Sequence, residues 1–89
     1  MAWLTCVKVL PGLRLYIETR DGRSAEIDVH ASIAGFDELR EPTLFAKVSI
    51  SELGELRWPN GDSVSPDEVE RMLAAGPPHA IVLPDVERA

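Results

Sequence analysis

Cysteine is almost absent from this chain of 89 residues, and Cys6 is the only one. A single cysteine forms no intramolecular disulfide and offers no thiolate cluster to a metal, which fits a reducing cytoplasm. We expect Cys6, which lies in an apolar segment, to behave as a small, inert, buried hydrophobe. Long apolar runs are missing as well, and the first residues lack the features of a signal peptide. The sequence therefore predicts one small cytoplasmic domain without a membrane span.

Residues with the spacing of a catalytic or metal site are also missing. His30 and His79 are far apart and match no ligand spacing, so metal binding is not expected. Ser63 and Ser65 lie in no nucleophile elbow, and adjacent carboxylates such as Asp37 and Glu38 diverge on a regular backbone. Because no Gly-rich phosphate loop is present either, we predict a protein that is not an enzyme and takes no cofactor.

Basic residues are few and dispersed. Nine Lys and Arg stand against fifteen Asp and Glu, which gives a net charge of −6, and the basic residues do not cluster between Lys8 and Arg88. A phosphate backbone is repelled by such a surface on average, so direct nucleic-acid binding is not expected. A basic protein partner, in contrast, would associate faster with it.

Two segments that alternate between apolar and polar residues predict a hairpin. The first runs from Leu13 to Thr19 and the second from Arg23 to His30, with apolar side chains at odd positions in both. Those side chains must share the buried face, and a two-residue loop would set apolar against polar positions. A three-residue loop ending with Gly22 in the left-handed region gives the right register. The predicted pairs are Thr19 with Arg23, Ile17 with Ala25 and Leu15 with Ile27.

A second hairpin is predicted by the same argument. Apolar residues stand at positions 46, 48 and 50 before the loop Glu52-Leu53-Gly54, and Leu56 and Trp58 follow it. This loop pairs Ile50 with Leu56 and Val48 with Trp58.

A further strand and a helical connection complete the sheet region. Leu4 to Leu10 is predicted as a strand that stops at the Pro11-Gly12 turn. The segment from Ile33 to Phe45 contains Gly35 and Pro42 and has no sustained period, so we expect one or two short helical turns there. The residues expected to pin it to the core are Phe36, Leu39, Leu44 and Phe45.

The clearest helix begins after Ser65. Ser65 and Glu68 match a capping box, and Pro66 takes the first helical position, where a missing amide costs nothing. Apolar residues then recur at helical spacing until Gly76 ends the run. The predicted fold is α+β, with an antiparallel sheet of about five strands built from two hairpins, one C-terminal helix and short helical turns. Residues 1–76 are predicted to form the domain, and 77–89 a Pro-rich tail that adds an edge strand or simply docks.

The segment Trp58-Pro59-Asn60-Gly61-Asp62 combines a large ring with a polar turn. In the structural interpretation, Trp58 caps the core, Pro59 ends the strand and Asn60-Gly61 turns the chain toward the helix. In the functional interpretation, the aromatic ring and the turn form a recognition surface. The structural interpretation is the favoured one. The candidate interaction surface consists of Trp58, Pro59, Asn60, Gly61, Asp62 and Tyr16.

Several of these segments resemble a family of short bacterial proteins known as domain of unknown function 2442. The resemblance covers about Val7 to Leu73, and its most specific part is the Trp-Pro-Asn-Gly-Asp stretch. It rests on residues 15–22, 26–29, 36–39, 45, 56–62 and 65–68. The resemblance implies an α+β domain and a bacterial source but no activity. Members of similar families are encoded beside a second small protein, which implies an antitoxin-like role, and others carry a fused helix-turn-helix.

We predict a non-enzymatic module that binds a small, basic protein partner through the exposed face of the sheet or the turn at residues 58–62. The alternative is a small-ligand or peptide binder that uses a groove between sheet and helix. A homodimer through an open edge strand stays a further alternative, since small α+β domains often leave an edge unpaired.

Overall fold

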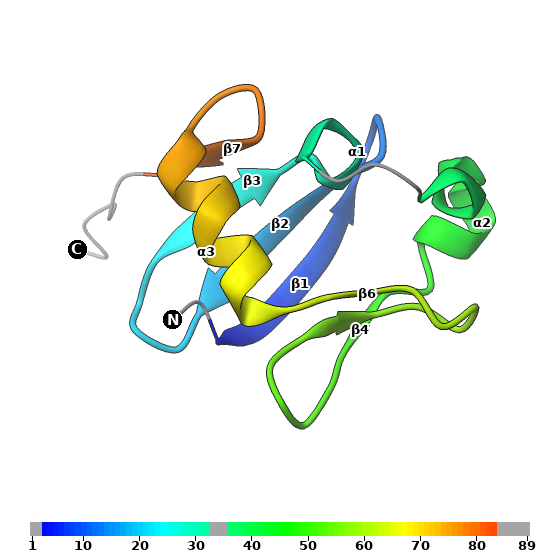
Figure 1. Ribbon diagram of the computed structural model, residues 1–89, viewed down its shortest axis with the longest axis horizontal. Helices are drawn as coiled ribbons and strands as arrows, with labels where there is room; N and C mark the ends of the chain where they lie inside the picture. The colour runs from blue at the N-terminus through cyan, green and yellow to red at the C-terminus, as the bar shows by residue number, and fades with distance from the viewer. Residues whose placement is uncertain (1–2, 33–35, 84–89) are drawn as a thin grey trace.

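The computed structural model describes residues 3–32 and 36–83 of the chain, and these form an α+β fold as predicted (Figure 1). The helical elements are α1 (Val29–Ser32), the 3-10 helix η1 (Asp37–Arg40), α2 (Pro42–Phe45) and α3 (Pro66–Ala75). The strands are β1 (Leu4–Leu10), β2 (Arg14–Thr19), β3 (Ser24–Ile27), β4 (Ser49–Ile50), β5 (Leu56–Arg57), β6 (Ser63–Val64) and β7 (Ala80–Val82).

The first sheet has the strand order β1-β2-β3-β7 and is antiparallel throughout. The prediction of a strand over Leu4–Leu10 is confirmed by β1. The register of the β2–β3 hairpin is also confirmed, because Leu15 pairs with Ile27 and Ile17 with Ala25. Its three-residue loop closes with a hydrogen bond from the Thr19 amide to the Arg23 carbonyl (2.9 Å), and Gly22 takes φ 94°.

The second strand of this hairpin is shorter than predicted. We expected it to reach His30, but β3 ends at Ile27 and α1 begins at Val29. The Asp28 carboxylate accepts a hydrogen bond from the Ala31 amide (3.1 Å), which turns the chain into the short helix. The alternation that predicted a longer strand therefore ends at a side chain that favours a helical turn.

The second hairpin belongs to a separate sheet, with the strand order β4-β5-β6. The predicted pair of Ile50 with Leu56 is confirmed, and Gly54 closes the loop at φ 76°. The ladder ends at the pair of Ser49 with Arg57, one residue before the predicted pair of Val48 with Trp58, which would continue the same register. The described residues thus form two sheets with seven short strands, where about five strands in one sheet were expected.

Helix α3 lies across the four-stranded sheet, as Figure 1 shows. The predicted capping box is present: the Glu68 amide donates to Ser65 Oγ (3.2 Å) and the Ser65 amide to Glu68 Oε1 (3.0 Å). Val69 and Met72 are buried in one cluster with Leu15 and Ile17 of β2. The side chains between these β2 residues point the other way, so we call the sheet surface opposite α3 the open face.

The core beneath α3 is mostly aliphatic. Its buried residues are Leu4, Leu15, Ile17, Ala25, Ile27, Val29, Leu39, Phe45, Leu56, Trp58, Val64, Val69, Met72, Leu73 and Ala80. The predicted anchoring of the connection is confirmed for its described part: Leu39 and Phe45 are buried, and Phe36 and Leu44 pack against the core. The predicted residues Ile33 and Gly35 lie outside the described residues.

The segment after α3 returns to the first sheet. Strand β7 pairs antiparallel with β3, with Ala25 beside Val82, Glu26 beside Ile81 and Ile27 beside Ala80. The tail therefore adds an edge strand, one of the two arrangements that the sequence left open. In the described part of the chain, no helix has the length and apolar character needed to cross a membrane.

Candidate functional site

The turn after β5 is held from inside by Trp58. Only 4% of this residue is exposed, and its Nε1 donates a hydrogen bond to the Phe45 carbonyl (3.1 Å). Its ring stacks on Phe45 with centroids 6.0 Å apart and meets Phe36 at 6.3 Å. This is the structural role that the sequence favoured. Because Trp58 is buried, it offers no surface to a partner while the protein is folded.

The outer side of the same turn is polar and internally braced. Asn60 Nδ2 donates to Glu38 Oε1 of η1 (2.6 Å) and to Asp62 Oδ2 (2.9 Å), and the Asp62 amide donates to Asn60 Oδ1 (3.0 Å). Pro59, Asn60 and Gly61 are exposed, and Asp62 is half-buried. The polar groups of the Asn60 side chain are thus engaged within the molecule.

Tyr16 lies in the other sheet, so the candidate residues do not form one continuous site. It stands on the open face at the centre of β2, where Lys8 of β1 is its cross-strand neighbour. The Lys8 Nζ lies 5.8 Å from the ring centroid, and the Tyr16 hydroxyl donates to Glu18 Oε2 (2.6 Å). This hydrogen bond to Glu18 raises the pKa of Tyr16 above its ordinary value, so the hydroxyl keeps its proton.

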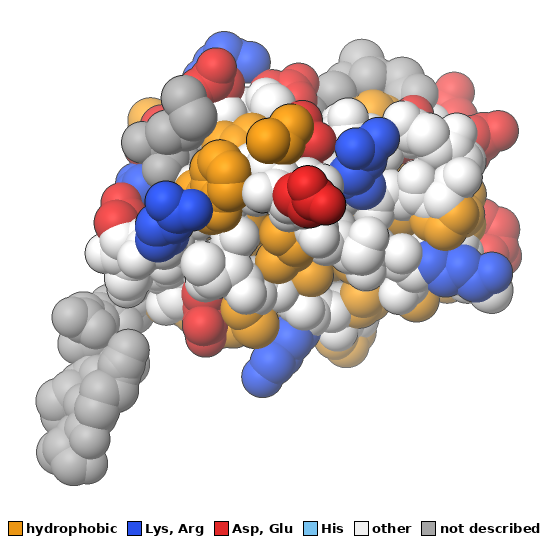
Figure 2. Space-filling model, turned by 90° about the horizontal axis from the view of Figure 1, so that it is seen from below, with side chains coloured by type: hydrophobic (Ala, Val, Ile, Leu, Met, Phe, Trp, Pro, Cys, Tyr) orange, Lys and Arg blue, Asp and Glu red, His pale blue; other side chains and the backbone are white. Residues whose placement is uncertain are grey.

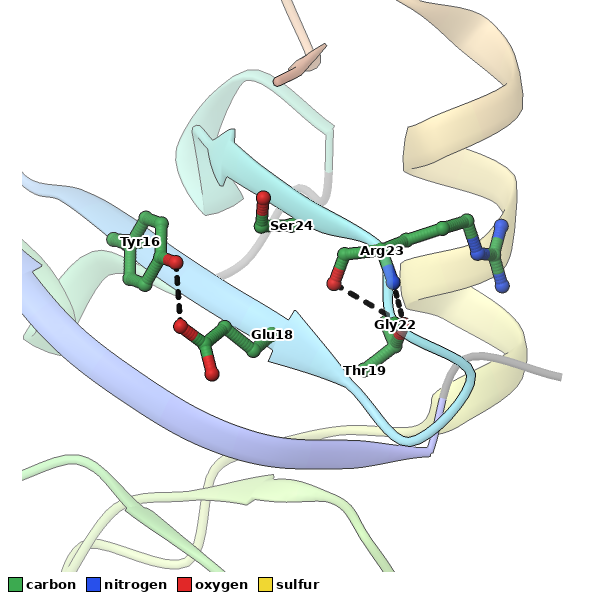
Figure 3. Close-up of a pocket in the computed structure, with 6 residues that line it drawn as sticks. All are labelled: Tyr16, Glu18, Thr19, Gly22, Arg23 and Ser24. Carbon is green, nitrogen blue, oxygen red and sulfur yellow. Dashed lines mark hydrogen bonds between the residues drawn. The ribbon is translucent and has the colours of Figure 1, made fainter. Parts of the chain in front are cut away.

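A hollow of about 120 Å³ opens beside Tyr16 on the open face (Figure 3). Its lining comes from the end of β2, the loop and the start of β3: Tyr16, Glu18, Thr19, Gly22, Arg23 and Ser24. Tyr16, Glu18 and Ser24 share the open face because Glu18 pairs with Ser24 across the hairpin. The loop is tightened by Thr19, whose Oγ1 accepts the Arg23 amide (3.0 Å) and donates to Asp21. The hairpin register that the sequence predicts therefore brings together the residues that line the hollow.

The Arg23 side chain points away from the hollow toward α3, as Figure 3 shows. Its two terminal nitrogens bind Glu70 at 3.0 and 2.9 Å, and its Nε binds both oxygens of Asp21 at 3.1 Å. These bonds lower the pKa of Asp21 to about 2 and lower that of Glu70 as well. The charge of Arg23 is therefore neutralised by Asp21 and Glu70.

The hollow is consequently rich in hydrogen-bond acceptors. Glu18 Oε2 accepts from Tyr16, whereas its Oε1 accepts no hydrogen bond from the described residues. The Ser24 hydroxyl stands on the same face, and a hydroxyl can both donate and accept. Such a set of oxygens fits a group that carries positive charge and several donors, such as an ammonium or a guanidinium. Neither histidine nor cysteine lines the hollow.

The remaining chemically notable side chains lie elsewhere. His30 packs against Phe45 with centroids 5.7 Å apart, and both of its ring nitrogens are buried without a hydrogen-bond partner in the described structure. Cys6, expected in the core, is instead half-buried on the open face beside Glu18. His79 precedes β7, and its carbonyl accepts from the Asp28 amide (2.9 Å). Across residues 3–32 and 36–83, no group of three or more His, Cys, Asp or Glu is placed to hold a metal.

Charged side chains are dispersed on the surface that Figure 2 presents, which looks from below the view of Figure 1. Lys and Arg side chains stand apart from one another among acidic and apolar ones. Among the described residues on that surface no basic patch forms, in keeping with the net charge of −6.

Sequence reasoning named Tyr16 but not Glu18 or Ser24. The signal was present in the hairpin register, which places these even-numbered residues together on the face opposite the core. Five of the six residues proposed from the sequence are consecutive, from Trp58 to Asp62, and lie in the loop between β5 and β6, whereas Tyr16 lies in the other sheet.

Comparisons with known proteins add no relative. No family model, no curated protein and no solved structure matches this chain. The resemblance to domain of unknown function 2442, with the bacterial source and the antitoxin-like role that it implies, stays a prediction.

Proposed function

We propose that this protein is a non-enzymatic interaction module that binds a basic protein partner through its open face, with the hollow beside Tyr16 receiving a Lys or Arg side chain. One observation carries the proposal: Glu18, which lines an acceptor-rich hollow, has a carboxylate oxygen that accepts no hydrogen bond from the described residues. The only cation of the lining, Arg23, is directed away from it.

The overall charge supports the same kind of partner. The chain carries a net charge of −6, so a basic protein is attracted over a longer range than any single contact reaches. At the contact itself, the Tyr16 ring offers an apolar surface to the methylene stem of a Lys or Arg whose charged end bonds to Glu18. Tyrosine is also among the residues that most often carry binding energy in protein interfaces.

The size of the hollow favours a side chain over a metabolite. Pockets for small organic ligands usually enclose about 300–1,000 Å³. The hollow encloses about 120 Å³, which suits the end of one long side chain. This favours the protein-binding hypothesis over the alternative of a small-ligand binder.

The structure likewise favours the open face over the turn at residues 58–62. Trp58 is buried, and the Asn60 side chain is engaged with Glu38 and Asp62. A partner at the turn would have to displace these bonds, whereas Glu18 Oε1 accepts no hydrogen bond from the described residues.

Capture from the native lysate tests this proposal with three tagged forms of the protein. Glu18→Gln keeps an oxygen acceptor for the Tyr16 hydroxyl but removes the charge. Glu52→Gln removes one charge from an exposed site in the β4–β5 loop and is the matched control. Loss of a charge-assisted hydrogen bond is expected to weaken retention about 10- to 100-fold in Glu18→Gln only. The captured protein should be basic and should elute with salt.

Two results would contradict the proposal. Equal retention of the same protein by Glu18→Gln and the unmodified chain would exclude the hollow as the contact. Loss of capture in a variant that combines Asn60→Ala with Asp62→Ala, with Glu18→Gln unaffected, would place the contact at the turn.

A further inference from the structure

The outer edge of β7 is the second feature of the fold that suits a partner. β7 is the last strand in the order β1-β2-β3-β7, so only one of its two sides is paired by the described residues. Its last two side chains are apolar and accessible, with Ile81 42% and Val82 49% exposed, whereas Ala80 is buried. An exposed apolar edge strand is a template for an added strand.

The pairing with β3 determines which backbone groups of β7 face outward. The Leu83 amide donates to the Ser24 carbonyl (2.9 Å), and the Asp28 amide donates to the His79 carbonyl (2.9 Å). Hydrogen-bonded and non-hydrogen-bonded pairs alternate along an antiparallel ladder. Ile81 therefore directs its amide and carbonyl toward Glu26, while Ala80 and Val82 direct theirs away from the sheet.

Three backbone groups of β7 that point outward therefore remain to form hydrogen bonds with a partner segment or with solvent. The Ala80 amide is already used, since it donates to the Gly76 carbonyl (3.1 Å). The Val82 amide, the Val82 carbonyl and the Ala80 carbonyl are left at the edge. An extended segment laid against β7 can bond to all three.

A second copy of the chain fits this edge poorly. If two copies paired about Val82, their described residues would share only the two bonds between the Val82 amides and carbonyls. A register shifted by one residue about Ile81 also gives only two bonds, because the Ala80 amide is already used. Each copy also carries a net charge of −6, so the copies repel each other.

The side-chain environment indicates what the added segment carries. Its residues opposite Ala80 and Val82 would lie on the side of Val82, where an aliphatic side chain buries exposed apolar surface. The residue opposite Ile81 would lie on the open face, two strands from Glu26, or about 10 Å between α-carbons. A Lys or Arg there can lay its stem on Ile81 and direct its charge toward Glu26, whose carboxylate also lies 3.7 Å from the Arg14 guanidinium.

We propose that β7 is a strand-addition site for an extended segment of the basic partner, in which aliphatic residues alternate with Lys or Arg. This proposal depends on the proposed function in one respect, namely that the partner is basic. The backbone hydrogen bonds supply affinity. The alternation of aliphatic and basic residues determines which side chains of the segment lie on each face of the sheet.

A peptide of defined sequence tests this site without knowledge of the partner. The probe is acetyl-Val-Lys-Val-Lys-Val-amide, titrated into the ¹⁵N-labelled full chain and followed by amide chemical shifts and hydrogen exchange. We expect shifts centred on Ala80, Ile81 and Val82, with slower exchange of the Val82 amide. Methylation of the valine amides, which face β7 in this register, should abolish these changes. Methylation of the lysine amides, which face away, should not.

A pair of protein variants separates the backbone bond from the side chain. Val82→Pro removes the outward amide hydrogen but no bond to β3, and proline is tolerated at such edge positions. It should weaken peptide binding about three- to tenfold relative to Val82→Ala, which keeps that amide. A thermal scan of both variants checks that they are folded.

The outcomes decide among the possible occupants of the edge. Equal binding of the two methylated peptides, or shifts confined to residues outside β7, would overturn the proposal. Protection of the Val82 amide without peptide, together with a dimer in analytical ultracentrifugation, would show that a second copy occupies the edge. Glu18→Gln should leave peptide pairing at β7 unchanged, so failure here is distinguishable from failure of the hollow.

Discussion

Replacing Gly54 with alanine tests how the β4–β5 hairpin is fastened to the N-terminal end of β1. Gly54 has φ 76°, and a β-carbon built on it would lie 2.6 Å from Cδ2 of the Trp3 ring. Arg20 also packs on Trp3, with its guanidinium carbon 4.6 Å from the ring centroid. The Gly54 carbonyl also accepts the Leu4 amide (3.3 Å), so the hairpin cannot simply move aside.

The structure gives the size of the effect. A left-handed backbone conformation costs an alanine about 1 kcal/mol, and forcing an extra carbon into an occupied space costs about 1–3 kcal/mol more. Gly54→Ala should therefore lower the free energy of unfolding by about 2–4 kcal/mol. For a domain of this size the melting temperature should fall by about 10–25 °C, measured by circular dichroism or calorimetry.

Two further variants separate the two causes. Gly22 has φ 94° but nothing within 4 Å of its β-carbon position, so Gly22→Ala should show the backbone cost alone, about 1 kcal/mol. In a Trp3→Ala background, Gly54→Ala should also fall to about 1 kcal/mol, because the ring is gone. If Gly54→Ala costs no more than Gly22→Ala in the unmodified chain, the Trp3 ring does not lie on Gly54 and the reasoning is refuted.

Two other predictions concern polar groups. His30→Leu should raise the free energy of unfolding by about 1 kcal/mol, because it removes two buried ring nitrogens without partners; a lower melting temperature in the variant would show that those nitrogens are satisfied. The pKa of Asp21, lowered from 3.8 to about 2, and the lowered pKa of Glu70 stabilise the fold above the ordinary carboxyl range, and this share is lost as the pH falls from about 4 to 2. Melting temperatures measured over that range should fall less steeply for Arg23→Gln than for the unmodified chain, and parallel curves would contradict the assignment.

The elements predicted correctly are those in which neighbouring residues decide the structure. The register of the β2–β3 hairpin follows from the parity of its apolar residues and from Gly22, all within the hairpin itself. Helix α3 likewise begins at a capping box that four consecutive residues define. These patterns work because the turn and the cap satisfy backbone groups locally.

The predictions are less complete where a group outside the alternating pattern binds the backbone. The β4–β5 ladder ends at Ser49 and Arg57, and the Val48 amide just before it donates to the Phe45 carbonyl at the end of α2. The burial of Trp58 depends on the same residue, since Phe45 supplies both a stacked ring and a carbonyl acceptor 13 positions away. Alternation in the sequence cannot report such a partner, because it describes only which side of a strand a residue occupies.

The two proposed contact sites also differ in whether the sequence alone could predict them. The hollow lies within the reach of sequence reasoning, because the correct hairpin register already places Tyr16, Glu18 and Ser24 on one face. The outward-facing groups of β7 could not be found from the sequence, because Ile81 and Val82 are both apolar and show no alternation that would reveal their pairing. Only the register with β3 decides that the Val82 amide and carbonyl face outward. Methylation of the peptide at alternate amides is therefore the sharper test, since it examines a property that no side-chain pattern encodes.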